Sequence, residues 1–206
     1  MHSSSKKVFF KKWVFKVYEN VYEPAEDSFL FANNLTVNKG DTVLDIGTGC
    51  GILGIIAAEK ASKVIATDIN PYAIRCAKEN AKLNKVENKI FFIQGDLFKP
   101  IKHGEKFDLI LFNAPYLPSE KTETKSWIEH AWTGGILGRE IIDQFIHYVP
   151  FYLKKDGYIL LMQSTISNVK KTLKEFKKHG LESNIIAEQD LPFFETIVLV
   201  KASFKD

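Results

Sequence analysis

The sequence predicts an α/β protein, because strand-like and helix-like segments alternate along its 206 residues. Five short apolar runs have strand length, and they lie at residues 42–46, 63–68, 90–94, 107–112 and 158–163. Apolar residues recur at helical spacing at 71–84, between the second and third runs, and at 167–179, after the fifth. Parallel strands need crossover connections that are usually helices, so this alternation indicates a largely parallel sheet with helices on its faces.

Local signals support the helices. Pro71 suits a first helical turn, where the N–H that proline lacks has no intrahelical partner. Gly180 directly follows the last predicted helix and can end it. A further helix is expected to begin near Pro24, with Asp27 and Ser28 in its first turn, where the helix dipole favours hydrogen-bond acceptors.

The two ends of the chain are expected to add strands. Residues 183–190 and 196–201 flank Leu191-Pro-Phe-Phe-Glu195 and are predicted to form an antiparallel closing hairpin. Residues 1–20 are rich in lysine and are predicted to form a basic arm or a short strand. With no repeat and no low-complexity linker, residues 1–206 are expected to form a single domain.

Composition limits the function. A net charge of +3 and a hydrophobic fraction of 45% are typical of an ordinary globular protein. No apolar run has membrane-spanning length, and lysines interrupt the apolar stretches at the N-terminus, so we expect a cytoplasmic protein that does not contact a membrane. Cys50 and Cys76 lack the spacing of metal ligands, so we expect reduced thiols and no metal. The mild positive charge permits a nucleic-acid partner without requiring one.

The helix predicted at 167–179 carries a cluster of lysines, namely Lys170, Lys171, Lys174, Lys177 and Lys178. Such a cluster fits either an RNA-binding face or a solvated surface. Phe176 belongs to the apolar side of this helix, so no aromatic residue interleaves with the lysines for base stacking. The sequence therefore favours the solvated surface.

A glycine-rich segment, Asp45-Ile-Gly-Thr-Gly-Cys-Gly-Ile-Leu-Gly54, follows the first predicted strand and opens a helix. Its glycines permit a tight turn and a close approach of a ligand to the backbone. Read from Gly49, it also fits the dinucleotide pattern G-x-G-x-x-G, which is a weak signal alone. Asp45 lies just before the glycines, where its charge would repel a phosphate and attract an ammonium or sulfonium group.

Two more carboxylates end the next two strands. Asp68 is placed to accept hydrogen bonds from both ribose hydroxyls. Asp96 can accept from an adenine amino group, and Ile69 and Leu97 can pack against the purine. Each acid could instead be a helix cap or a turn residue. Three acids at the ends of successive strands, beside a glycine loop, fit a cationic nucleoside without phosphate, which describes S-adenosylmethionine.

The fourth strand runs into Asn113-Ala-Pro-Tyr116. Asn113 offers a carbonyl acceptor, and Pro115 keeps Ala114 extended, which fixes the direction of the backbone carbonyls. Two oxygens held in this way can accept both hydrogens of a planar NH2 group, while Tyr116 covers its plane. The segment therefore suits chemistry on an amide or aromatic amine nitrogen, although a loop after a buried strand is the plain alternative.

Four separated motifs together resemble the class I methyltransferases, and within them the HemK family. They are Val21–Leu30 (VYEPAEDSFL), Ala66–Pro71 (ATDINP), Asn113–Tyr116 and Ala131–Glu140 (AWTGGILGRE). The similarity is to the archaeal and eukaryotic branch, which methylates class I translation release factors, and it covers roughly residues 21–200. One departure is Ala114, which stands where the family usually has a proline; the acceptor there is a main-chain carbonyl, so we expect a looser loop with its chemistry kept.

The resemblance implies a Rossmann-like seven-stranded sheet with an antiparallel C-terminal strand. It implies S-adenosylmethionine as the methyl donor and, as the acceptor, the glutamine of a release factor's Gly-Gly-Gln tripeptide. Implied cofactor-binding residues are Tyr22, Pro24, Glu26, Ser28, Asp45, Gly47, Thr48, Gly49, Gly51, Asp68, Ile69, Asp96, Leu97 and Asn113. Implied catalytic residues are Asn113, Ala114, Pro115 and Tyr116. Implied substrate-binding residues are Asn113, Tyr116, Trp132, Gly134 and Gly135.

Several alternatives stay open. The same amide-holding geometry suits an exocyclic amine of adenine or guanine in RNA or DNA, and related enzymes have been assigned lysine methylation. A nicotinamide oxidoreductase and a non-catalytic assembly factor fit less of the sequence. Trp132 with Gly134 and Gly135 forms either an acceptor pocket or a simple turn. The branch also works with a small zinc-binding activator that adds a strand to the sheet edge, and residues 90–94 are either that edge or a buried strand.

Overall fold

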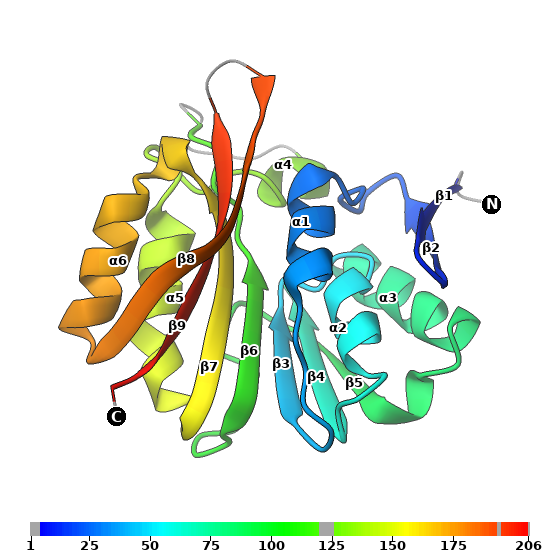
Figure 1. Ribbon diagram of the computed structural model, residues 1–206. Helices are drawn as coiled ribbons and strands as arrows, with labels where there is room; N and C mark the ends of the chain where they lie inside the picture. The colour runs from blue at the N-terminus through cyan, green and yellow to red at the C-terminus, as the bar shows by residue number, and fades with distance from the viewer. Residues whose placement is uncertain (1–4, 120–125, 193–194, 206) are drawn as a thin grey trace.

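A seven-stranded sheet forms the centre of the protein in the computed structural model, which describes residues 5–119, 126–192 and 195–205 (Figure 1). Its strand order is β5-β4-β3-β6-β7-β9-β8. The strands are β3 (Thr42–Ile46), β4 (Lys63–Asp68), β5 (Ile90–Gln94), β6 (Phe107–Asn113), β7 (Leu153–Ser164), β8 (Leu181–Asp190) and β9 (Thr196–Phe204). β3 to β7 pair in parallel, and β9 is antiparallel to both of its neighbours. The predicted α/β class and antiparallel C-terminal strand are confirmed.

All five predicted core strands occur, and the first three have the predicted bounds. The fifth strand begins at Leu153, earlier than predicted, because the polar residues 154–157 hide its start in the sequence. Its register shifts in this region, where Phe107 pairs with Leu153 and Leu109 pairs with Tyr158. The predicted closing hairpin is β8 and β9, and residues 193–194 of its connection lie outside the described residues.

Helices cover both faces of the sheet (Figure 1). One face carries α1 (Glu26–Asn34), α2 (Ile52–Ala57) and α3 (Pro71–Leu83), and the other carries α5 (Glu140–Tyr148) and α6 (Val169–Lys178). Short elements join them, namely α4 (Trp127–His130), η1 (Glu87–Lys89), η2 (Val149–Phe151) and η3 (Thr165–Ser167). Alternate strand residues feed the two apolar clusters, as Leu109 and Ile110 do in β6. α6 starts later than predicted because Asn168 caps it, accepting a hydrogen bond from the Lys171 N–H at 3.1 Å.

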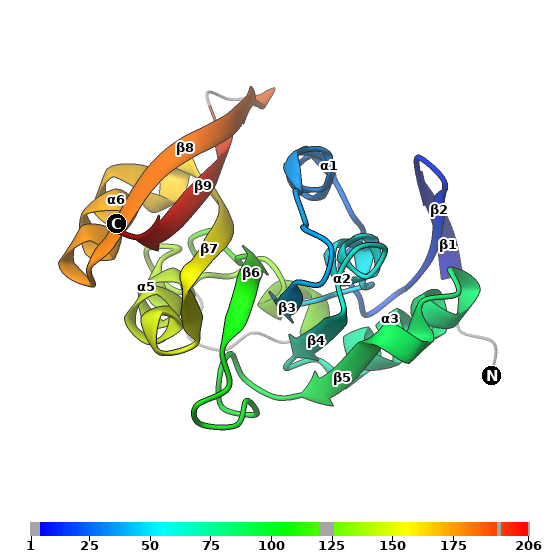
Figure 2. The ribbon, with the colours of Figure 1, turned by 60° about the horizontal axis from the view of Figure 1, so that its bottom comes forward.

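The predicted N-terminal arm is a β-hairpin, apart from residues 1–4, which lie outside the described residues. β1 (Ser5–Phe10) and β2 (Trp13–Tyr18) pair with each other and lie beside α3, away from the main sheet (Figure 2). Asn80 of α3 and Asn84, which caps the end of α3, hold the edge of β2 that does not pair with β1. Asn84 Oδ1 accepts from Val14 N–H at 3.1 Å, and Asn80 Oδ1 accepts from Lys16 N–H at 2.8 Å.

A candidate site opens where the parallel strands end. The loops that follow β3, β4, β5 and β6 meet at this edge, as expected for an open α/β sheet. Within the described residues, no helix has the length and apolar character needed to cross a membrane.

Candidate active site

A cavity of about 400 Å³ lies at the carboxyl ends of β3, β4, β5 and β6, and the segment before α1 closes one side of it. This volume is in the range of small-molecule sites. Three carboxylates line it, those of Asp27, Asp68 and Asp96, and no described lining residue is lysine, arginine or histidine. An acid-rich cavity without basic groups suits a cationic ligand and disfavours a pyrophosphate.

Asp45 holds the glycine loop from behind. Its side chain is almost fully buried, at 1% exposure, and does not line the cavity. One carboxylate oxygen accepts from the Thr48 hydroxyl at 2.6 Å and from the Gly54 N–H at 3.0 Å. Burial raises the pKa of this carboxyl to about 7, even though both hydrogen bonds oppose that rise. The Asp45 carboxylate thus holds the glycine loop, and its predicted contact with the cofactor stays a prediction.

Asp68 does line the cavity. Its two oxygens accept from the Gly49 N–H at 2.8 Å and from the Asn70 N–H at 2.9 Å, so the carboxylate is fixed in place. A carboxylate has about four lone-pair sites, which leaves capacity for a further donor such as a ribose hydroxyl. Burial raises the pKa of Asp68 to about 6, with the backbone hydrogen bonds opposing the rise.

The residues predicted to surround adenine also line the cavity. Asp96 lines it and also forms an ion pair with Lys99 at 2.6 Å. Leu97 is buried with a left-handed backbone (φ 45°), which turns the chain sharply after Asp96. Ile69 also lines the cavity and is exposed, so its side chain is free to cover an apolar ring.

Asn113 lines the cavity at the end of β6, and its side chain is anchored on one side only. Its amide NH2 donates to Asp27 Oδ2 at 3.1 Å and to Ser28 Oγ at 3.3 Å. A carboxylate can only accept, so this contact fixes which end of the amide faces Asp27. The Asn113 Oδ1 atom is buried and has no hydrogen-bond partner within the described part of the chain. A buried acceptor without a partner costs free energy and is uncommon in native structures.

Asp27 connects this amide to the segment before α1. Its Oδ1 accepts from the Tyr22 hydroxyl at 3.0 Å and from Ser28 Oγ at 3.1 Å, while its Oδ2 faces Asn113. The sequence placed Asp27 only in the first turn of a helix, where its Oδ1 also accepts from the Ser28 N–H at 2.5 Å. The sequence feature that could have identified Asp27 is its position beside Ser28 in the Val21–Leu30 motif. Its contact with Asn113 joins residues 86 positions apart in the sequence.

Tyr116 completes this part of the site. It lines the cavity and is partly buried. Burial, followed by the nearby negative charge of Asp27, raises the pKa of Tyr116 well above its ordinary value. The same two causes raise the pKa of Tyr22. Both rings therefore stay as neutral phenols at any physiological pH.

A loop that precedes α5 supports the Asn113–Tyr116 segment. The Leu117 N–H donates to the Trp132 carbonyl at 2.8 Å, and the Gly134 N–H donates to the Leu117 carbonyl at 3.0 Å. These bonds form a short parallel bridge between Leu117 and Thr133. Trp132 and Thr133 line the cavity, so this loop forms part of its wall.

The glycines of this loop allow it to pack tightly against the Asn113–Tyr116 segment. A Cβ atom added to Gly134 would lie 2.6 Å from the Pro115 carbonyl oxygen. A Cβ on Gly138, whose φ is +65°, would lie 2.2 Å from the Tyr116 carbonyl oxygen. Gly134 and Gly135 do not line the cavity, so their visible contribution is loop packing.

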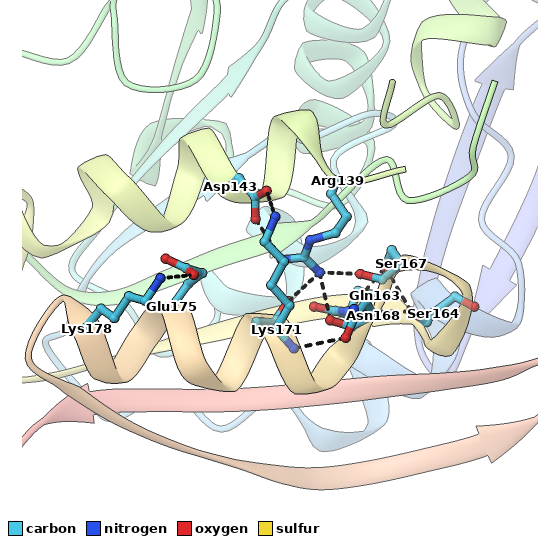
Figure 3. A network of polar contacts seen from close by, with 10 residues as sticks. Arg139, Asp143, Gln163, Ser164, Ser167, Asn168, Lys171, Glu175 and Lys178 are labelled. Carbon is cyan, nitrogen blue, oxygen red and sulfur yellow. Dashed lines mark hydrogen bonds and ion pairs between the residues drawn. The ribbon is translucent and has the colours of Figure 1, made fainter. Parts of the chain in front are cut away.

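Arg139 anchors the far end of the same loop (Figure 3). Its buried guanidinium donates to the Asn168 carbonyl at 2.8 Å, to Thr172 Oγ1 at 3.0 Å and to the Ser167 carbonyl, and it pairs with Asp143 at 2.7 Å. These partners lie on η3, α6 and α5. The network therefore fixes the loop against the helices on the far face of the sheet.

Fifteen of the twenty predicted site residues line the cavity, namely Tyr22, Pro24, Ser28, Gly47, Thr48, Gly49, Asp68, Ile69, Asp96, Leu97, Asn113, Ala114, Pro115, Tyr116 and Trp132. The others are Glu26, Asp45, Gly51, Gly134 and Gly135. Of these, Glu26 is exposed, and Gly51 begins α2 and packs against Ala77 of α3.

The sheet with its antiparallel β9, and the acid-lined cavity beside a glycine loop, define a class I methyltransferase. Residues 27–114 match the family model of ribosomal protein L11 methyltransferase (PrmA). The putative protein N5-glutamine methyltransferase MJ0928 of Methanocaldococcus jannaschii is 46% identical over 186 residues, which cover 89% of this chain and 92% of that protein. The human methyltransferase HEMK2 is 36% identical over 176 residues, covering 80% of this chain and 81% of the relative.

A solved structure shares the fold. The Mtq2-Trm112 complex of E. cuniculi superposes with a TM-score of 0.70 at 24% identity, covering 90% of this chain and 99% of that chain. The sequence relatives establish the family: the chain belongs to the HemK-type methyltransferases.

Proposed function

We propose that this protein transfers a methyl group from S-adenosylmethionine to the side-chain amide nitrogen of a glutamine in a translation release factor. The observation that carries the proposal is the buried, unpartnered Oδ1 of Asn113, because a buried acceptor requires a donor. Asn113 lines the cavity, and in this proposal the amide N–H of a bound substrate would supply the missing partner.

The cavity residues suit S-adenosylmethionine. Asp68 would accept from the ribose hydroxyls and Asp96 from the adenine amino group, with Ile69 and Leu97 against the ring. Three carboxylates and the absence of basic groups among the described lining residues favour a positively charged ligand without phosphate. When bound, S-adenosylmethionine supplies a methyl group on a cationic sulfur, which is open to attack by a nitrogen lone pair.

The protein's own contribution is to position the acceptor. Asn113 Oδ1 and the Ala114 carbonyl would each accept one amide hydrogen, which directs the nitrogen lone pair toward the methyl group. Asp27 fixes the orientation of the Asn113 amide, since its carboxylate accepts from the NH2 group and leaves Oδ1 for another donor. Positioning of this kind can supply several kcal/mol of a reaction barrier. Tyr116 would cover the plane of the bound amide.

The names of relatives support the choice of acceptor. The 46% identical archaeal protein is named a protein N5-glutamine methyltransferase. A protein from Schizosaccharomyces pombe, 27% identical over 192 residues, is named the catalytic subunit of an eRF1 methyltransferase. Release factor glutamine methyltransferase of Aquifex aeolicus is 34% identical over 159 residues.

A small activator subunit is a further part of the proposal. β5 is an edge strand of the sheet, and its Phe91 is 55% exposed. An open edge with an exposed apolar side chain invites strand addition. The related Mtq2 was solved as a complex with Trm112. Co-expression with such a zinc-binding subunit should raise solubility and activity, and Phe91→Glu should abolish that gain; an unaffected gain would exclude this edge.

Mass spectrometry tests the proposed reaction. The protein, with and without the activator, is incubated with S-adenosylmethionine and a release factor, and the modified residue is mapped. The proposal predicts one added methyl group on the glutamine of the Gly-Gly-Gln tripeptide. Parallel reactions with RNA and DNA test the nucleobase alternative, and methylation of nucleic acid alone would overturn the assignment.

A further inference from the structure

Positive charge is concentrated in the β1–β2 hairpin. Residues 5–18 contain five lysines and no acidic residue, whereas the whole chain has a formal net charge of +3. The rest of the chain, without those five charges, therefore carries a formal charge of −2. Charge distributed so unevenly attracts a polyanion to one end of the molecule.

The strand register divides the hairpin side chains between two faces. One face carries aromatic residues that join the main core, namely Phe10, Trp13 and Phe15. The other, which we call the outer hairpin face, carries Lys7 and Phe9 of β1 opposite Lys16 and Val14 of β2. Phe9 is 66% exposed, and both lysines are exposed. An exposed aromatic ring thus lies beside a pair of cations.

The two lysines of the outer hairpin face repel each other. Lys7 and Lys16 are directly opposite across the two strands, where like charges destabilise the pairing. Within the described residues neither forms an ion pair, whereas Lys6 pairs with Glu23 at 2.7 Å and Lys12 pairs with Glu59. The fold leaves this repulsion without internal compensation, and an anionic ligand would relieve it.

The outer hairpin face is held rigidly. Asn80 of α3 and the cap residue Asn84 each both accept from and donate to the backbone of β2, at distances between 2.8 and 3.1 Å. Glu79 is the nearest acid on α3, and it is already engaged by the Tyr18 hydroxyl and by Arg75 at 3.6 Å. Lys7, Lys16 and Phe9 therefore extend from a hairpin that α3 holds in place, and the nearby Glu79 carboxylate is already engaged by Tyr18 and Arg75.

We propose that the outer hairpin face binds a single-stranded polynucleotide. An unpaired base would stack on Phe9, while Lys7 and Lys16, with Lys11 at the turn, would contact phosphates. Aromatic rings interleaved with cations are the usual arrangement for strands without base pairing. The inference concerns a surface separate from the cavity and does not depend on the proposed methyl transfer.

The lysines of α6 provide an internal contrast. Two of them are used in ion pairs, Lys171 with Asp143 and Lys178 with Glu175. The one aromatic residue of α6, Phe176, is fully buried. A lysine cluster without an exposed ring fits a solvated face, so charge alone does not identify the binding surface.

Fluorescence anisotropy tests the proposal with the full chain. The probes are a labelled oligouridylate and the matching oligothymidylate, which separate RNA from DNA. We expect a dissociation constant of roughly 1–100 µM at physiological salt. The affinity should fall steeply as the salt concentration rises. Lys7→Gln/Lys16→Gln should weaken binding about tenfold and reduce the salt dependence by roughly one to two ions. Phe9→Ala should weaken it by about five- to a hundredfold, through lost stacking.

Lys174→Gln/Lys177→Gln is the matched control, since it removes the same charge from exposed positions of α6. It should bind as the wild type does, and circular dichroism should show all variants folded. If the control weakened oligonucleotide binding as much as the hairpin substitutions do, the effect would come from net charge alone, and the proposal would be overturned. Absence of binding to both oligonucleotides would also overturn the proposal. A parallel assay with phosphatidylserine vesicles tests a membrane surface instead, and hairpin substitutions that weaken only vesicle binding would likewise overturn it.

Discussion

The two halves of the cavity satisfy their polar groups differently. On the side of β3 and β4, Asp68 uses both oxygens for backbone N–H groups, and Asp45 holds the glycine loop. On the side of β6, the Asn113 amide is anchored through its NH2 group while its oxygen is buried without a partner. On the side of β3 and β4 the carboxylates therefore have hydrogen-bond partners before a ligand binds. On the side of β6 the Asn113 oxygen lacks a partner in the absence of a ligand.

This difference indicates where binding and turnover are controlled. Groups that are already hydrogen-bonded contribute mainly to ligand affinity, because they change little when the reaction occurs. A pre-oriented acceptor with no partner contributes mainly to turnover, because it positions the reacting amide. Substitutions in the two halves should therefore separate cofactor affinity from turnover.

The largest effect is expected for Asn113→Ala. Loss of the acceptor should reduce turnover by about a hundred- to a thousandfold, which is the usual loss for one pre-organised hydrogen bond in an active site. Affinity for S-adenosylmethionine, measured by calorimetry, should be nearly unchanged. Wild-type turnover of labelled methyl transfer in this variant would refute the role of the amide.

Asp68→Ala should have the reverse effect. Cofactor affinity should fall by about ten- to a hundredfold through lost charged hydrogen bonds, while turnover at saturating cofactor is largely kept. The wild-type affinity should also fall by about tenfold per pH unit below pH 6, because the Asp68 pKa is raised to about 6 and the protonated carboxyl is the weaker acceptor. Calorimetric titrations showing unchanged affinity in Asp68→Ala would remove the ribose assignment.

Asp27→Asn tests how Asn113 is oriented. An asparagine at this position can face the Asn113 amide with either end, so Oδ1 is no longer fixed, and turnover should fall by roughly tenfold. Cofactor affinity should change less than turnover. Glu23→Gln, an exposed carboxylate in the same segment, is the control and should behave as the wild type. A wild-type rate in Asp27→Asn would mean that the amide is oriented by other groups.

Gly138→Ala tests the loop that supports the Asn113–Tyr116 segment. Both Gly138 and Gly104 have a positive φ, so alanine costs about 1–2 kcal/mol of backbone strain at either position. Only at Gly138 does the new Cβ also approach the Tyr116 carbonyl oxygen, at 2.2 Å, and the loss of unfolding free energy should reach roughly 3 kcal/mol. Urea denaturation of both variants measures this difference. Equal losses would show that the contact is easily relieved.

Asp45→Asn should give the smallest effect, on the pH dependence of stability. The folded pKa of about 7 lies above the ordinary value, so this carboxyl contributes stability that is complete below about pH 4 and is lost as pH rises through 7. Asparagine can accept the same two hydrogen bonds without charge, and it should flatten the stability profile between about pH 4 and pH 7. The carboxyls with lowered pKa, Asp108 and Asp143, are present in both proteins, so the comparison isolates Asp45. Identical profiles would contradict its burial as a charged group.

The parts of this structure that the sequence predicted follow from local periodicity. Strand and helix spacing located the sheet, and the parallel order then brought Asp68, Asp96 and Asn113 to one edge. The sequence could not reveal that Asp27 contacts Asn113, because that contact depends on where α1 lies against β6. For the same reason it could not reveal that the Asp45 carboxylate holds Thr48 and Gly54.

The sequence pattern also could not predict how the loop before α5 packs against the Asn113–Tyr116 segment. Gly134 and Gly135 were predicted to admit a substrate, and the same residues fit a simple turn. The structure shows that the Gly134 position is crowded by the Pro115 carbonyl, a constraint that arises only after the two loops have come together.

A crystal structure with S-adenosylhomocysteine and a glutamine-containing release-factor peptide tests the central claim most directly. We predict that the glutamine amide nitrogen lies about 2.7–3.2 Å from both Asn113 Oδ1 and the Ala114 carbonyl oxygen. A bound glutamine held by other groups, with Asn113 Oδ1 still lacking a partner, would contradict the account.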